Sequence, residues 1–144
     1  MKRTYTITGG LVLITLLTVV SAQAQSTNSP QIANIPFEFS AGSQVMPSGK
    51  YAVTVVNPSS DQRVIKLKSL ESGESVMLMT HSFKSGNEEK SSLVFNRYGD
   101  HYFLSRAQRS GDSAGMEAVK SKAEREASKA FTKPINETIA LRSN

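Results

Sequence analysis

The sequence contains no cysteine and only two histidines among its 144 residues. Without cysteine, the protein forms no disulfide and carries no lipid on an N-terminal cysteine. Small secreted eukaryotic domains usually rely on disulfides to compensate for a small core, whereas exported bacterial domains often lack them. The absence of cysteine therefore favours a bacterial protein, provided that the chain is exported.

The shortage of histidine and cysteine also limits metal binding. A structural zinc site needs four ligands and a catalytic one needs three plus water. The combination that the sequence offers is His81, His101 and Asp100, near the ends of predicted strands. Since an isolated histidine on a strand is more often a partly exposed surface residue, we predict no metal site and no cofactor.

Patterns typical of catalytic sites are weak as well. Ser113 stands in a Gly-x-Ser-x-Gly stretch (residues 111–115), but this stretch lies in a predicted loop and not in the strand-to-helix turn of a nucleophile elbow, and no glycine-rich phosphate loop occurs. The carboxylates that a glycosidase would need lie in predicted turns, where solubilising residues are common: Glu38, Asp61, Glu71 and Glu74. We therefore predict no catalytic residue and no enzyme, and keep a hydrolytic enzyme as an alternative because a fold does not exclude catalysis.

Basic residues exceed acidic ones only slightly. The chain has 17 basic and 12 acidic residues, and without Lys2 and Arg3 the count is 15 against 12, a charge of +3. Lys66 and Lys68 form a closely spaced alternating pair in a predicted strand, which is typical of its solvated face. Nucleic-acid binding needs basic side chains concentrated on one face, so we predict none. Weak attraction to an anionic lipid or polysaccharide surface stays open.

The first 24 residues have the three parts of a secretory signal peptide. Lys2 and Arg3 come first, residues 11–20 are apolar, and Ala22 and Ala24 supply the small residues that signal peptidase requires. This pattern predicts cleavage after Ala24 and a secreted or periplasmic protein. Residues 25–34 are polar and are predicted to form a flexible leader.

An uncleaved membrane anchor is the alternative, because no charge occurs between Arg3 and Glu38. A spanning helix needs about 20 predominantly apolar residues. The apolar run of residues 11–20 is about half that length, which favours cleavage.

Residues 35–107 alternate short apolar runs with turn residues, as all-β domains do. The predicted strands cover residues 35–39, 51–56, 63–70, 76–81, 92–98 and 101–107. Strands joined by short connections usually pair with their neighbours in the chain. We predict a mainly β protein with an antiparallel meander of about six strands, closed as a small barrel or folded as a sandwich.

Two of these strands carry specific predictions. The Gly99-Asp100 pair between residues 92–98 and 101–107 predicts a hairpin with a type II′ turn. In residues 76–81, Met77 and Met79 share one face. We predict that they pack in the core, with a soft-metal site or an adaptable apolar pocket as alternatives. The phenylalanines are expected to fill the core, with a sugar-stacking or lipid-facing surface as the alternative, while Tyr98 and Tyr102 flank the hairpin.

Residues 108–144 are predicted to form a loop, a short helix and a C-terminal tail. Ser121 and Glu124 match a capping box, and Ala123, Ala127 and Phe131 lie on one helical stripe. Pro134 ends the helix. Residues 135–141 contain apolar residues that can form a last extended segment, which stays open.

Four segments resemble a group of small exported bacterial proteins: residues 35–39 (IPFEF), 46–51 (MPSGKY), 93–104 (LVFNRYGDHYFL) and 121–126 (SKAERE). The resemblance covers most of the predicted mature chain. It implies a single exported domain and implies no activity.

The sequence therefore favours a noncatalytic β module of the bacterial envelope or secreted fraction that acts by binding, through an exposed strand edge or the charged helix. A small-barrel carrier of an apolar ligand is the alternative, motivated by strands with apolar residues on both faces.

Overall fold

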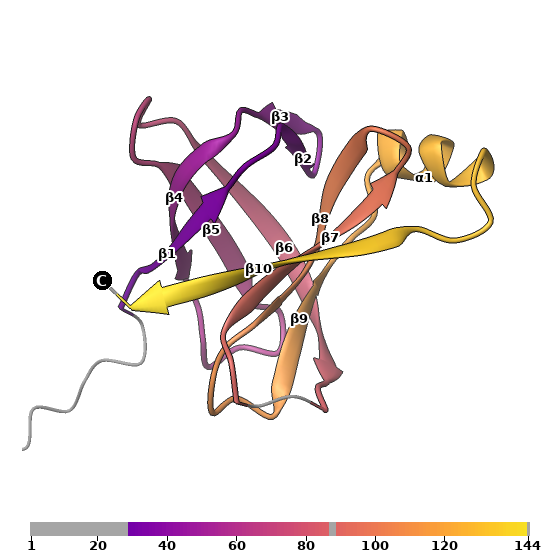
Figure 1. Ribbon diagram of the computed structural model, residues 1–144. Helices are drawn as coiled ribbons and strands as arrows, with labels where there is room; N and C mark the ends of the chain where they lie inside the picture. The colour runs from indigo at the N-terminus through magenta and orange to yellow at the C-terminus, as the bar shows by residue number, and fades with distance from the viewer. Residues whose placement is uncertain (1–28, 87–88, 144) are drawn as a thin grey trace, which may run out of the picture.

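The computed structural model describes residues 29–86 and 89–143. It consists of ten strands and one helix within that range: β1 Gln31–Ile35, β2 Phe39–Ala41, β3 Gln44–Met46, β4 Gly49–Val55, β5 Val64–Ser69, β6 Ser75–Lys84, β7 Ser92–Tyr98, β8 His101–Gln108, β9 Ala114–Ala118, α1 Lys122–Lys129 and β10 Ile135–Ser143. The predicted signal peptide and residues 25–28 of the predicted leader lie outside the described residues. Figure 1 shows the strands wrapped into a barrel, with α1 on its outside.

Eight of the described strands close the barrel in the order β8-β7-β10-β1-β4-β5-β6-β9, and β9 pairs back with β8. All of these pairings are antiparallel. The arrangement consists of two three-stranded meanders, β4-β5-β6 and β7-β8-β9. On one side they are joined by β1 and β10, and on the other by the β6–β9 pairing. Closure leaves few strand edges open, which protects such a protein from edge-to-edge aggregation.

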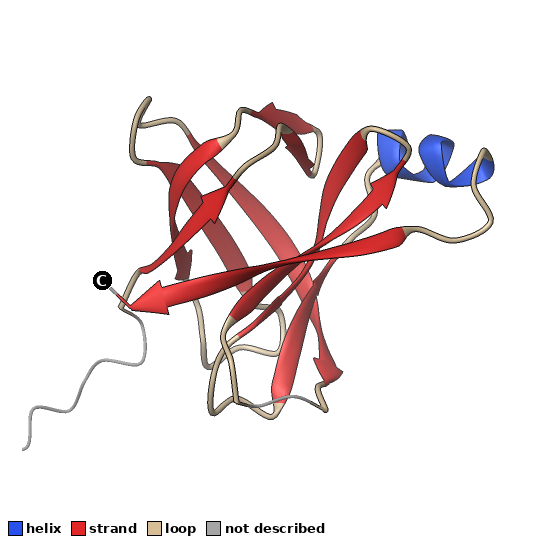
Figure 2. Cartoon of the chain, in the orientation of Figure 1, coloured by secondary structure: helices blue, strands red, loops and turns tan. Residues whose placement is uncertain are grey.

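The predicted mainly β fold is confirmed, and the barrel is the form that it takes (Figure 2). The predicted number of six strands is too low, and a simple meander is wrong. β6 does not pair with β7, the next strand in the chain, because β9 lies beside β6 and β10 lies beside β7. Pairing between neighbours in sequence is a tendency, and closure of the barrel overrides it here.

The start of the barrel differs from the prediction. Strand β1 begins at Gln31, inside the segment predicted to be a flexible leader, and buries Ala33 and Ile35. The predicted strand over residues 35–39 is interrupted after Ile35 at Pro36, which has no N–H to donate to a ladder. The chain resumes as β2, which forms a hairpin with β3 and pairs with β8 through Ser40 and Phe103.

The end of the barrel differs more. The predicted boundary at residue 107 does not separate the barrel from the rest of the chain, because β9 and β10 are both barrel strands. Strand β10 pairs with β7 over residues 135–140 and with β1 over residues 141–143. Ile139 and Leu141 pack against the core. The segment predicted as a tail therefore joins the two halves of the barrel.

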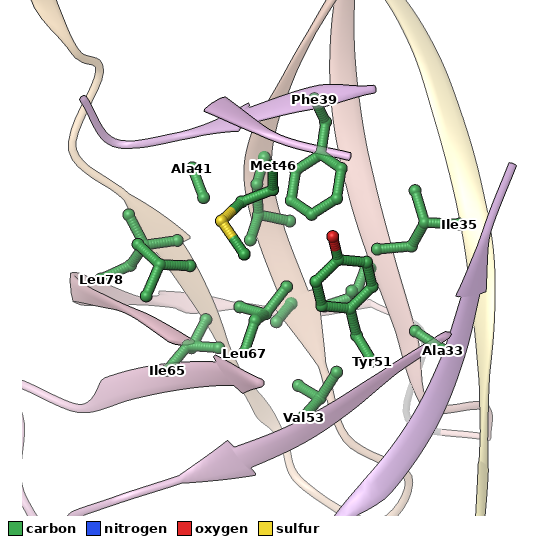
Figure 3. Close-up of a cluster of buried hydrophobic side chains, with 14 of the residues drawn as sticks. Ala33, Ile35, Phe39, Ala41, Met46, Tyr51, Val53, Ile65, Leu67 and Leu78 are labelled. Carbon is green, nitrogen blue, oxygen red and sulfur yellow. The ribbon is translucent and has the colours of Figure 1, made fainter. Parts of the chain in front are cut away.

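The interior is filled by apolar side chains that alternate along the strands. Tyr51, Val53 and Val55 of β4 and Ile65 and Leu67 of β5 point inward and are buried. Figure 3 shows this cluster, with the Tyr51 ring between Phe39 and Val53. The predicted period-two burial in residues 51–56 and 63–70 is confirmed, and Lys66 and Lys68 face outward as predicted.

Tyr51 anchors the chain reversal that precedes it. Its buried hydroxyl donates a hydrogen bond to the carbonyl oxygen of Pro47 at 2.5 Å. Burial is the main cause that raises the pKa of the Tyr51 hydroxyl above the ordinary value of 10.0, and the nearby Glu74 and Glu71 carboxylates raise it further.

This shift predicts an alkaline loss of stability. The folded protein holds the Tyr51 proton more tightly than the unfolded chain does. The stability that the protonated Tyr51 hydroxyl gives to the fold is therefore complete below pH 10 and is lost as pH rises through the raised pKa. We expect the urea midpoint of the protein to fall above pH 10 more steeply than that of Tyr51→Phe. At neutral pH the variant loses only about 1 kcal/mol, for one hydrogen bond. Parallel curves for the two proteins above pH 10 would contradict the assignment.

The hairpin prediction is confirmed. Strands β7 and β8 pair from Tyr98 and His101 onward, with Gly99 and Asp100 between them. Gly99 has φ of 61°, whereas no other residue type has positive φ among the described residues. Positive φ at the first central residue alone is the requirement of a type II′ turn.

Helix α1 lies against the outer face of this hairpin. The Ser121 hydroxyl caps it by accepting the Glu124 N–H at 3.1 Å, as the capping box predicts. The Glu124 carboxylate, however, accepts a hydrogen bond from Asn96 Nδ2 at 2.8 Å, and it is only 3% exposed. The predicted apolar stripe is therefore wrong in part, because the helix buries Glu124 and leaves Ala123 exposed. Phe131 docks only partly, with its ring centroid 6.2 Å from that of Tyr98.

Arg63 holds the opposite end of the barrel together. Its guanidinium, 7% exposed, pairs with Asp112 Oδ2 at 2.5 Å and donates to the carbonyl oxygens of Ala114 and Gly115 at 2.7 and 3.2 Å. The Thr80 hydroxyl donates to the Arg63 carbonyl oxygen at 2.7 Å. Arg63, just before β5, thus contacts β6 through its backbone carbonyl oxygen, and β9 and the loop before it through its guanidinium.

Candidate functional site

The residues considered for a metal site are exposed, and His81 lies on a different strand from His101, which Asp100 directly precedes. His81 is on the outer face of β6 opposite Glu117, while His101 starts β8 opposite Tyr98. Asp100 lies in the turn, and its side chain is fully exposed. Within residues 29–86 and 89–143, no three histidine, cysteine, aspartate or glutamate side chains are grouped closely enough to hold a metal ion.

The turn carboxylates considered for hydrolysis are also exposed. They lie in three connections of the barrel: Glu38, Asp61, Glu71 and Glu74. Glu38 lies between β1 and β2, Asp61 between β4 and β5, and Glu71 and Glu74 between β5 and β6. This arrangement offers no buried carboxylate pair.

The barrel interior leaves little room for a ligand. A cavity between Val53, Ile65 and Met116 has a volume of about 10 Å³. That is about the volume needed for one water molecule. The side chains of the core fill the space that a ligand carrier keeps open.

The outside of β6 carries apolar side chains that the core does not use. Met77 is 60% exposed and Met79 is 65% exposed, so the prediction that both methionines pack in the core is wrong. The physical reason is register: Val76, Leu78 and Thr80 of the same strand point inward, which turns the methionines outward.

The two methionines border an open groove along a seam of the barrel. β9 pairs with β6 only from Thr80 to Lys84, so no described strand pairs with residues 75–79 of β6 on that side. The turn between β2 and β3 packs over this gap, and a Cβ at Gly42 would lie 3.0 Å from Leu78. The groove between the turn and β6 has a volume of about 530 Å³.

The groove also includes Val119, which is 54% exposed where the chain leaves β9. We call Met77, Met79 and Val119 the seam patch. The Thr80 N–H donates to the carbonyl oxygen of Arg63, which directly precedes β5, and alternate residues of a strand direct their backbone groups to opposite neighbours. The N–H and C=O groups of Met77 and Met79 therefore face the seam.

Cations border the seam patch. Lys66 of β5 lies directly across from Met77, and Lys68 lies across from Ser75, on the same outer face. Lys120 follows Val119 and is exposed. The nearest acidic residues along the chain are Glu74 and Glu117, so the surroundings of the patch are slightly basic.

A second groove lies on the outer wall of the barrel, across β10, β7, β8 and the end of β6. We call it the wall groove; it has a volume of about 390 Å³ and is lined by Phe83, Lys90, Ser92, Val94, Arg106, Gln108, Asn136 and Thr138 among others. Arg106 lies over the Phe83 ring, with 5.9 Å from its guanidinium carbon to the ring centroid.

Gly115 makes the shape of this wall possible. Phe83 and Gly115 are cross-strand partners, and a Cβ at residue 115 would lie 2.3 Å from the Phe83 ring. Only glycine lets the ring lie flat on β9. Beside the ring, the 7% exposed Gln108 donates to the Asp112 carbonyl oxygen at 2.6 Å, while its Oε1 has no partner among the described residues.

The described residues include no helix long and apolar enough to cross a membrane. A scan against protein-family models found no match, and neither the curated proteins nor the solved structures gave one.

Sequence reasoning missed the wall groove, and it kept an apolar pocket at Met77 and Met79 only as an alternative to core packing. The seam depends on which face of β6 turns inward, and the wall groove depends on β10, which was expected to be a tail. The sequence signal that bears on the seam is the Met77-Leu78-Met79 pattern itself, since it places two methionines on one face in either register.

Proposed function

We propose that the protein is a noncatalytic binding module of the bacterial envelope or secreted fraction, which docks a partner polypeptide on the seam patch. The observation that carries the proposal is the exposure of Met77 and Met79 beside a stretch of β6 that no described strand pairs with on the β9 side, where the β2–β3 turn covers the gap. Exposed apolar side chains that gather in one place often mark an interaction site.

The chemistry of the patch indicates the kind of partner. Methionine side chains are unbranched and polarisable, so they adapt to apolar side chains of different shape. Lys66 and Lys68 lie next to the methionines on the same face. We therefore expect a segment that presents apolar side chains flanked by carboxylates, with complementary charge guiding its approach.

Export is supported by the pattern of residues 1–24, which ends in Ala22-Gln23-Ala24. The resemblance to small exported bacterial proteins points the same way. The apolar-ligand carrier is supported less well, because the interior cavity beside Met116 holds about one water.

Site-specific photocrosslinking in the exporting bacterium tests the proposal. A photoreactive phenylalanine analogue replaces Met77 or Met79 in turn. Val56 and Leu70, 49% and 52% exposed but outside the groove, provide matched control positions. We expect an adduct with a second polypeptide from positions 77 and 79 and none from positions 56 and 70.

Three results would contradict the proposal. An adduct of twice the chain mass would show that the patch joins two copies of this protein. A lipid adduct alone would show a membrane contact, and equal adducts at all four positions would show contact without a defined site.

A further inference from the structure

We infer that the wall groove binds an acidic saccharide, through a carboxylate held by Arg106 and hydroxyl groups held by neighbouring polar side chains. This inference is independent of the seam patch, because the two grooves share no lining residue. Either proposal can therefore fail without the other.

Arg106 is the first reason. It is half-buried in the wall, and its guanidinium contacts the Phe83 ring without a hydrogen bond or ion pair to any described residue. Glu117 is its cross-strand neighbour, yet the two side chains form no ion pair. A groove guanidinium without a hydrogen-bond partner among the described residues is suited to a planar carboxylate, which it binds through two parallel hydrogen bonds.

The second reason is the neutral polar lining beside the cation. Ser92, Asn136 and Thr138 come from adjacent strands β7 and β10 and line the same groove. Hydroxyl and amide groups both donate and accept, which matches the hydroxyls of a sugar ring. Lys90 adds a second positive charge to the lining.

The third reason is Gln108, more than nine-tenths buried in the floor of the groove. Its amide nitrogen is satisfied by two backbone carbonyl oxygens, but Oε1 has no donor among the described residues. A buried acceptor left without a donor costs free energy. Because Oε1 itself is buried, a ligand hydroxyl would supply that donor only after the side chains above it move aside, whereas a simple anion would supply none.

The size of the groove agrees with a small ligand. Its 390 Å³ falls within the range of about 300–1,000 Å³ that is common for ligand pockets. Phe83 and Val94 provide apolar surface for the carbon face of a ring.

Binding of glucuronate to the purified protein, followed by the amide NMR shifts of Val94 and Thr138, tests the inference. Glucose, acetate and inorganic phosphate are the comparison ligands, and a short polyuronate separates a polysaccharide from a free sugar acid as the source. We expect glucuronate to bind at least tenfold more tightly than glucose, acetate or phosphate. Arg106→Gln is expected to weaken glucuronate binding at least tenfold and to leave that of glucose unchanged.

Arg142→Gln is the matched control, because Arg142 is exposed near the C-terminal end of β10 and does not line the groove. Its affinity for glucuronate should equal that of the unchanged protein. Equal binding of glucose and glucuronate, equal binding of phosphate, no binding of any ligand, or full affinity in Arg106→Gln would each overturn the inference.

Discussion

A chain that ends at Pro134 is expected to lose its cooperative unfolding transition. Removing β10 takes away the strand that joins β7 to β1, together with the core contacts of Ile139 and Leu141. Two long strand edges and part of the core become exposed. The free energy of unfolding of such a domain is only about 5–15 kcal/mol. We therefore expect the domain that lacks this strand to be unfolded or aggregated. Thermal unfolding followed by circular dichroism measures this.

A matched pair of substitutions in the full-length chain shows whether the barrel contacts of β10, and not the shortening of the chain, cause the loss of stability. Ile139 packs against the core, whereas its neighbour Thr138 faces the outer wall. Ile139→Lys places a charge toward the barrel interior and is expected to lower stability by about 3 kcal/mol or more. Thr138→Lys should change it by less than about 0.5 kcal/mol. Equal losses of stability in the two substituted proteins would show that β10 is not a barrel strand, and so would a truncated chain that still folds.

Replacing Arg63 by alanine is expected to cost about 3 kcal/mol, as for other buried ion pairs from which one partner is removed. The substitution breaks the contact with Asp112 and leaves two backbone carbonyl oxygens without their donor. Arg142→Ala, at an exposed position, is expected to cost less than about 0.5 kcal/mol. Urea unfolding of the three proteins measures the difference.

A double-mutant cycle with Asp112 tests the reason for that cost. Asp112→Ala is destabilising on its own, because this carboxylate also accepts the Ala114 N–H at 3.0 Å. If Arg63 and Asp112 act together, the doubly substituted protein loses clearly less than the sum of the two single losses. Additive losses would mean that Arg63 acts through the backbone carbonyl oxygens alone.

The strands that sequence reasoning found are those with strict alternation and clear turn residues. In residues 51–56 and 63–70, β-branched and apolar side chains alternate with polar ones, and a period of two has one structural explanation. Gly99 predicted the hairpin correctly because the turn needs a positive φ, which few residues other than glycine adopt. Both signals are local, so no tertiary information was needed.

The strands that were missed depend on contacts far along the chain. β10 follows a helix and a proline, and its apolar residues are only partly buried. Its pairing with β1 joins Ala33 to Leu141, residues at opposite ends of the described chain. Strand propensity says little about such pairings, because packing against neighbours determines them.

The orientation of β6 was missed for a related reason. Both faces of residues 76–81 are apolar, with Val76 and Leu78 on one face and Met77 and Met79 on the other. Hydrophobicity then cannot choose between the two registers. Burial of the branched residues in the barrel leaves the methionines outside, and the candidate docking surface follows from that choice.

Oxidation of methionine by peroxide, followed by mass spectrometry, shows directly which face of β6 points out of the barrel. Besides Met1, the chain has two buried methionines, Met46 and Met116, and the two exposed methionines of the seam patch. In the purified protein, Met77 and Met79 are expected to oxidise at least about tenfold faster than the buried pair. In cells that produce the protein, only Met77 and Met79 should become protected. Equal rates for all four methionines would contradict the barrel register, and unchanged rates for Met77 and Met79 in the cell would contradict docking at the seam.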